Sequence, residues 1–117
     1  MSMKQINKKE GASVMKELTE IVVITAKLYK QSGEVVDVTP ENGTDFSLQE
    51  LQGYVGGYIE TLALNHNRFM VINEEGKFVK GAKRNEKATE IAAESGAIWF
   101  EDFIVGDALV CTASMVK

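Results

Sequence analysis

A pair of adjacent glycines between a helical pattern and a strand pattern constrains the fold of this chain more than any other feature. Residues 48–60 read LQELQGYVGGYIE. Apolar residues recur at helical spacing up to Val55, and an alternation typical of a strand begins at Tyr58, after Gly56-Gly57. Glycine adopts positive φ without a Cβ clash, so it ends helices and reverses the chain. The stretch therefore predicts a tight helix-to-strand junction.

Length and composition indicate one ordinary globular domain. The chain has 117 residues, of which 44% are hydrophobic and 26% charged, and this is enough to bury a single core. Cys111 is the only cysteine, which excludes an internal disulfide and fits a reducing compartment. Apolar runs such as Ile21–Ile24 are far shorter than the ~20 residues that span a bilayer, and no signal-peptide core follows the N-terminus. We expect a cytoplasmic protein without a membrane segment.

The charge of the chain is acidic overall but unevenly distributed. The formal net charge of −4 argues against binding of bulk nucleic acid. Residues 77–87 nevertheless contain five cations and one acid, whereas residues 90–107 contain five acids and no cation. A solvated loop beside a solvated helix explains this pattern. The alternative is a polar docking surface for a partner.

The predicted elements describe an α+β domain. Residues 1–20 form a polar tail with a short helix after Ser13, and residues 21–117 form the single domain. Its sheet is mainly antiparallel, with about five strands, and two short helices pack on one face. The expected strands are Ile21–Tyr29, Glu34–Thr39, Tyr58–Leu64, Arg68–Ile72, Lys77–Val79 and Ile104–Cys111; the expected helices begin after the N-caps Ser47 and Asn85.

Four ordered motifs resemble a known family. They are LQGYVGGYIE (Leu51–Glu60), MVINEEGK (Met70–Lys77), the helix start Asn85-x-x-Ala88-Thr89, and IVGDALV (Ile104–Val110). Together they resemble a family of small domains of unknown function that phages, plasmids and other mobile elements carry in bacteria. The resemblance extends from residue 22 to residue 110 and implies a compact α+β fold. It supplies no catalytic residue, and residues before Ile21 lie outside it.

No catalytic, metal-binding or cofactor-binding set emerges from the sequence. His66 is the only histidine, lies in an Asn-His-Asn turn and has no companion ligands for zinc. Cys111 lies in an apolar strand and is expected to be buried and inert. Gly56-Gly57 closes a helix, so it does not form a phosphate loop. Because no nucleophile–base pair is visible, we expect no enzymatic activity, no metal and no cofactor.

Aromatic residues and the basic segment supply the candidate binding residues. Tyr54 and Tyr58 flank the glycine pair, and Tyr58 is expected to be exposed near Lys83 and Arg84. The Trp99-Phe100-x-x-Phe103 cluster adjoins acids, which favours a core or a protein interface over nucleic-acid stacking. The candidate binding residues are Tyr54, Tyr58, Lys83 and Arg84.

Two functional hypotheses follow. The first is a non-enzymatic accessory protein of a phage or plasmid that binds a host or element protein, with counter-defence as one version. The second is a small-ligand or nucleotide-binding module, in which the two tyrosines stack on a base and the basic segment contacts phosphate. The sequence leaves the partner and the oligomeric state open.

Overall fold

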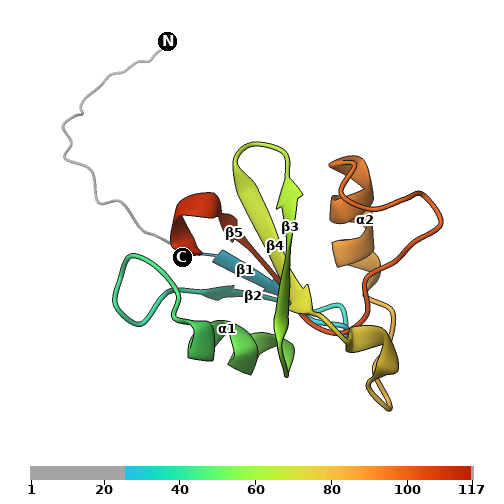
Figure 1. Ribbon diagram of the computed structural model, residues 1–117, viewed down its shortest axis with the longest axis horizontal. Coiled ribbons are helices and arrows are strands. Elements are labelled where there is room, and N and C mark those ends of the chain that lie inside the picture. Colours follow the sequence, from blue (N-terminus) through green and yellow to red (C-terminus); the bar gives the residue numbers. More distant parts are fainter. Residues whose placement is uncertain (1–25, 117) are drawn as a thin grey trace, which may run out of the picture.

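A computed structural model describes residues 26–116, which form a five-stranded sheet with two α-helices (Figure 1). The expected α+β class is confirmed. The expected helix after Ser13 lies outside the described residues. In chain order, the elements are β1 (Ala26–Tyr29), β2 (Val35–Val38), α1 (Leu48–Val55), β3 (Ile59–Leu64), β4 (Arg68–Asn73), the short 3₁₀ helix η1 (Gly76–Phe78), α2 (Glu86–Glu94), β5 (Ala108–Thr112) and the 3₁₀ helix η2 (Ala113–Met115).

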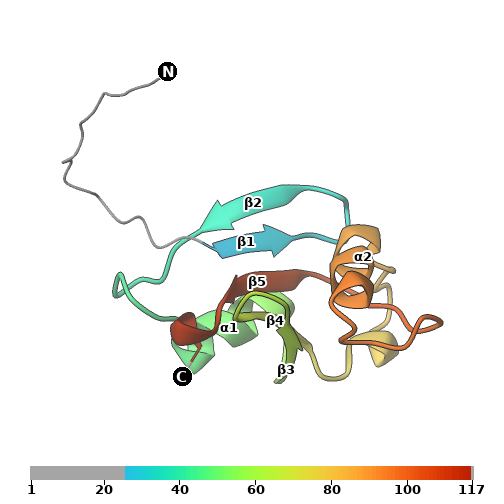
Figure 2. The same cartoon turned by 90° about the horizontal axis from the view of Figure 1, so that it is seen from above.

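The sheet consists of two hairpins joined by the last strand. The strand order is β2-β1-β5-β4-β3, and every neighbouring pair is antiparallel. Figure 2 shows this order, with β2 and β3 at the two edges. The central strand β5 carries the run Ala108–Cys111, which is buried on both faces of the sheet. Both edges of the sheet therefore belong to hairpins.

The two helices cover opposite faces, and each has its own core cluster. Leu51 and Val55 of α1 pack with Leu109 and Cys111 of β5. Ala88 and Ala92 of α2 belong to the cluster that contains Ala108 and Val110 of the same strand. Neighbouring strand residues point to opposite faces. The expectation that both helices pack on one face is therefore wrong, because the apolar residues of β5 supply a core on each side.

Helix α1 begins and ends as its sequence predicts. The Ser47 hydroxyl accepts a hydrogen bond from the backbone N–H of Glu50, and the Glu50 carboxylate accepts one from the N–H of Ser47. This reciprocal capping box satisfies two donors that the first turn leaves unpaired. Gly56 follows the helix with φ of 84°, in the left-handed region. Gly57 is not among the glycines with positive φ, so the reversal occurs at Gly56 alone.

Two other expectations are corrected. Residues 76–78 form the 3₁₀ helix η1, so Lys77–Val79 is not a strand. The last strand begins at Ala108, because Gly106 has φ of 87° and turns the chain before it. Ile104 and Val105 instead run beside the start of α2, where Val105 forms an isolated bridge with Arg84. The segment between α2 and β5 is consequently a long loop that lies over the sheet.

Candidate functional site

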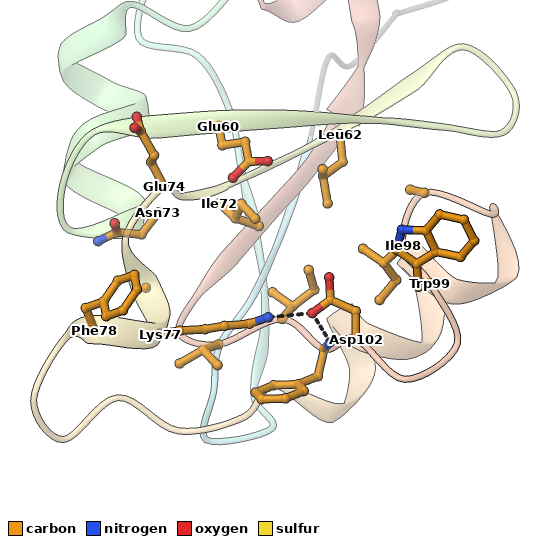
Figure 3. A pocket seen from close by; sticks show the side chains of 15 residues that line it. Glu60, Leu62, Ile72, Asn73, Glu74, Lys77, Phe78, Ile98, Trp99 and Asp102 are labelled. Atoms are coloured by element: carbon orange, nitrogen blue, oxygen red, sulfur yellow. Dashed lines mark hydrogen bonds and ion pairs between the residues drawn. The ribbon is translucent and has the colours of Figure 1, made fainter.

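A groove lies on the face of the sheet that α2 covers, with a volume of about 260 Å³ (Figure 3). Leu62 of β3 and Ile72 of β4 line it on the sheet side. Phe78 of η1 stands at one end, and Ile98 and Trp99 stand at the other. These ends come from the two loops that enter and leave α2. The groove is thus formed by segments that are far apart in the sequence.

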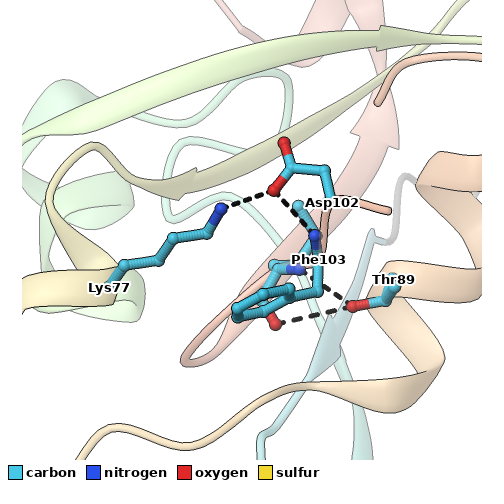
Figure 4. Close-up of polar contacts among 5 residues, drawn as sticks. Lys77, Thr89, Asp102 and Phe103 are labelled. Atoms are coloured by element: carbon cyan, nitrogen blue, oxygen red, sulfur yellow. Dashed lines mark hydrogen bonds and ion pairs between the residues drawn. The ribbon is translucent and has the colours of Figure 1, made fainter. Parts of the chain in front are cut away.

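An ion pair crosses the bottom of the groove. The Lys77 ammonium contacts the Asp102 carboxylate, which also accepts a hydrogen bond of 2.7 Å from the backbone N–H of Phe103 (Figure 4). These two donors, with Lys77 contributing most, hold the pKa of Asp102 below its usual range. The Lys77 nitrogen lies 4.5 Å from the centre of the Phe103 ring, and the Arg84 guanidinium carbon lies 5.2 Å from it. The contacts connect η1 to the loop after α2.

Buried hydrogen bonds fix that loop to α2. The backbone N–H of Ile104 donates to the Thr89 hydroxyl at 2.9 Å, and the carbonyl of Ile104 accepts from the N–H of Asn85 at 2.8 Å. The Asn85 side chain donates to the carbonyls of Tyr29 and Gly106, both at 2.8 Å. Since Asn85 and Thr89 are buried, these bonds are shielded from water. They position the loop that carries Ile98 and Trp99.

Large aromatic side chains around the groove are exposed to an unusual degree. Tyr58, Phe78, Trp99 and Phe100 have 73%, 86%, 83% and 89% of their surface accessible. Phe78 and Trp99 line the groove itself, and Tyr58 and Phe78 line an adjoining hollow. Phe100 instead faces a hollow beside α2. Solvation of so much aromatic surface is unfavourable unless a partner covers it.

The groove also carries negative charge. Glu60 of β3 and Glu74 after β4 line it. Both are exposed, and neither forms an ion pair within residues 26–116. The cation that lines the groove, Lys77, is already paired with Asp102. The unpaired charge of the groove is therefore acidic.

The predicted binding residues do not form one site. Tyr54 and Tyr58 border adjoining hollows that share Gly56, Asn73 and Val79, whereas Lys83 and Arg84 line neither hollow. The backbone of Lys83 pairs with Gln31 and Gly106. Arg84 contacts Glu86 and the Phe103 ring.

The environments of the two tyrosines differ. Tyr54 is half-buried, and its ring meets Phe46 edge to face with centroids 5.9 Å apart. Burial raises its pKa. Tyr58 is exposed, as its position predicts, while Ile59 packs partly against the cluster that α1 covers. Tyr54 therefore serves the core, and Tyr58 remains available on the surface.

Phe78 was not a candidate from the sequence, and Trp99 had two interpretations. In the expected strand, the Phe78 side chain would point to one face of the sheet. In η1 it is exposed instead. Trp99 is exposed, so the interpretation that it belongs to the core is wrong, and its use at an interface stays a prediction. The signal that could have found both is their location in polar loops, where an aromatic residue has no amphipathic pattern to bury it.

The remaining candidates agree with structural roles. Cys111 is buried in β5, and burial raises the pKa of its thiol to about 11, which keeps it protonated at neutral pH. His66 has φ of 63° in the turn between β3 and β4.

Within the described residues, no three His, Cys, Asp or Glu side chains gather in a way that could hold a metal ion. No helix of residues 26–116 is long and apolar enough to cross a membrane.

Comparison with known proteins identifies the family. Residues 21–115 match the model of a family described as a domain of unknown function, DUF3846. No curated protein and no solved structure matches the chain. The match extends over most of the chain and includes all the elements that form the groove. The chain therefore belongs to the DUF3846 family.

Proposed function

We propose that this protein is a non-enzymatic accessory protein that binds another protein through the groove between β3, η1 and the loop after α2. The observation that carries the proposal is the exposure of Phe78 and Trp99 at the two ends of this groove. Interfaces are enriched in tyrosine, tryptophan and phenylalanine, and buried aromatic anchors supply much of their binding energy.

The surroundings of the aromatic residues support a protein partner. The groove combines apolar residues with exposed carboxylates, which is the composition of an interface core with a polar rim. The Lys77–Asp102 pair connects two of its walls, and the hydrogen bonds of Thr89 and Asn85 with Ile104 hold one of these walls on α2. A pre-positioned surface loses less entropy when it binds, so more of the contact energy appears as affinity.

The cellular context of the proposal rests on the resemblance of the four motifs to domains of bacterial mobile elements. On that basis, the partner is a host protein or a protein of the element, the compartment is the bacterial cytoplasm, and interference with host defence is one version of the role. The single cysteine and the acidic net charge support the cytoplasm as the compartment.

Nucleotide binding is the alternative that the sequence left open. The ring of Tyr54 packs on Phe46, and Lys83 and Arg84 lie away from both tyrosines' hollows. The contacts that this alternative needs are therefore not assembled around Tyr58. A thermal-shift panel of nucleotides tests it, since a ligand at 100 times its Kd stabilises a protein by about 2.7 kcal/mol.

Capture from bacterial lysate tests the protein-binding proposal. The immobilised wild-type protein should retain a discrete partner, and Trp99→Ala and Phe78→Ala should each reduce its recovery. Phe100→Ala is the matched control, because Phe100 is equally exposed and adjacent in sequence but faces another hollow. Equal loss with Phe100→Ala, or recovery unchanged by the two groove variants, would assign binding to another surface.

A further inference from the structure

The open edge of β3 borders the groove and has the geometry of a strand-binding site. β3 is the last strand in the sheet order, with β4 on its one paired side. The N–H of Glu74 donates to the carbonyl of Tyr58 at 2.8 Å, which makes residues 58 and 74 a hydrogen-bonded pair. Such pairs alternate along antiparallel strands. Residues 60 and 62 therefore bond to β4, and residues 59, 61 and 63 direct their backbone groups outward.

The hydrogen bonds on the far side of β4 agree with this assignment. The N–H of Ala113 donates to the carbonyl of Asn67 at 2.9 Å, so the odd-numbered residues of β4 bond toward β5. Its even-numbered residues must then bond toward β3. Thr61 and Ala63 are exposed. Within residues 26–116, no other segment bonds to the outward amides of Ile59, Thr61 and Ala63.

β3 has few of the features that usually protect an edge strand. Its sequence, IETLAL, contains no lysine and no proline, and its register with β4 is continuous from Ile59 to Leu64 without a bulge. Glu60 is its single charge. The other edge strand, β2, carries Asp37, which forms an ion pair with Lys27. A sparsely protected edge beside a groove suits addition of a strand from a partner.

Charge identifies the kind of strand that fits. Side chains of Glu60 and Leu62 point to the groove face, so an added strand would place every second side chain there. A cation on that strand would lie opposite or diagonal to Glu60. An apolar side chain would lie next to Leu62 and extend toward Ile98. The groove thus favours a segment with alternating basic and apolar side chains on one face.

A second copy of this chain fits less well. Antiparallel pairing of two β3 strands centred on Thr61 would place Glu60 of each copy diagonally across from Glu60 of the other. Like charges at such positions destabilise a sheet. Glu74 would add further negative charge on each side. Repulsion therefore favours a cationic partner over self-association.

We propose that β3 binds an extended basic and apolar segment of the partner by strand addition, with its backbone on Ile59, Thr61 and Ala63 and its side chains in the groove. This inference rests on the proposed protein-binding function and specifies the chemistry of the bound segment. The lysine or arginine side chains of the segment contact Glu60, and its apolar side chains pack between Leu62 and Ile98.

Amide hydrogen exchange with a model peptide tests this. The probe is a short acetylated and amidated peptide in which lysine, threonine, valine and threonine repeat. With saturating peptide, the amides of Ile59, Thr61 and Ala63 should exchange at least about tenfold more slowly than without it, because each gains a hydrogen bond. Affinity should fall as salt rises, since the charges are exposed. Binding without protection of these amides would overturn strand addition.

Two peptide controls and two protein controls sharpen the test. A peptide with glutamate in place of lysine, and one N-methylated at every second residue, should each bind about tenfold more weakly, the equivalent of one net hydrogen bond or charge pair. Thr61→Pro removes one outward N–H and should weaken binding similarly. The variant should still fold, because proline is tolerated at sheet edges. Val35→Pro, on the opposite edge strand, should leave affinity unchanged. Equal binding of the glutamate peptide would overturn the charge assignment.

The outcomes distinguish this inference from the proposed function. Lysate capture that depends on Trp99, together with no amide protection by the peptide, would refute strand addition and retain the groove as a protein-binding site. Amide protection together with no lysate partner would support the strand site and refute the proposed cellular role. Concentration-dependent dimerisation that Thr61→Pro abolishes would assign the edge to a second copy and overturn the proposal.

Discussion

The side-chain nitrogen of Asn73 donates a hydrogen bond to the carbonyl oxygen of Val55 at 3.2 Å, which joins the end of β4 to the end of α1. A Cβ atom on Gly57 would lie 2.9 Å from that same nitrogen. The two glycines after α1 therefore have different roles. Gly56 supplies the positive φ that reverses the chain, and Gly57 leaves room for the Asn73 amide.

Alanine substitution at the two glycines should distinguish these roles. Gly56→Ala should cost on the order of 1–2 kcal/mol through backbone strain, whether or not residue 73 is asparagine. Gly57→Ala should displace the Asn73 amide and cost about 1 kcal/mol, a cost that disappears in the Asn73→Ala background. Urea unfolding of the single and double variants measures the coupling of residue 73 with residue 56 and with residue 57. Additive effects for the pair of residues 57 and 73 would show that the predicted contact is unimportant.

Asn85 should be among the most sensitive polar residues of the fold. It is 1% exposed, its Oδ1 accepts from the N–H of Ala88, and its Nδ2 serves the carbonyls of Tyr29 and Gly106. Asn85→Ala removes a helix cap and leaves two carbonyls without this donor, which should cost on the order of 3 kcal/mol. Chemical denaturation measures the loss. Asn42→Ala, a cap of an exposed turn, is the control and should cost less than about 1 kcal/mol.

Glu50 should make the fold sensitive to acid. Hydrogen bonds from the backbone N–H groups of Ser47 and Glu41 lower the pKa of its carboxyl group. Because the folded pKa lies below the unfolded value, this stabilisation is complete above the unfolded pKa and disappears as pH falls through the folded pKa. The urea midpoint should therefore decline as the pH falls below about 4.5, the usual pKa of a glutamate carboxyl group.

Glu50→Gln should reduce that decline, since an uncharged amide can still accept one bond but does not titrate. Glu94→Gln is the control, because the Glu94 carboxylate makes no hydrogen bond within the described residues. A pH profile of Glu50→Gln that coincides with the wild-type profile would show that the capping box does not contribute to acid sensitivity.

Local signals predicted most of the elements because capping and turn chemistry depend on few neighbouring residues. Ser47 with Glu50, and Asn85 before its helix, marked the two helix starts correctly. The assignment of both helices to one face was wrong because it required knowing that β5 is central. Residues 108–111 are apolar without alternation, and such a run fits burial on both faces.

The candidate site was harder to predict because it depends on distant contacts. Tyr58 was identified correctly as exposed, but Tyr54 packs on Phe46, which precedes it by two turns of helix and the N-cap. The groove forms only when η1 and the loop after α2 meet over β3 and β4, as the Lys77–Asp102 pair shows. No local pattern encodes such a meeting.

Site-specific photo-crosslinking in bacterial cells tests the proposed protein-binding groove most directly. A photoreactive phenylalanine derivative would replace Trp99 or Phe78 at the groove, or Leu48 as a control on the helix of the opposite face. We predict the same discrete protein adduct from positions 99 and 78 and none from position 48. Adducts from position 48 alone, or no adduct from either groove position in cells that contain the native partner, would contradict the proposed binding surface.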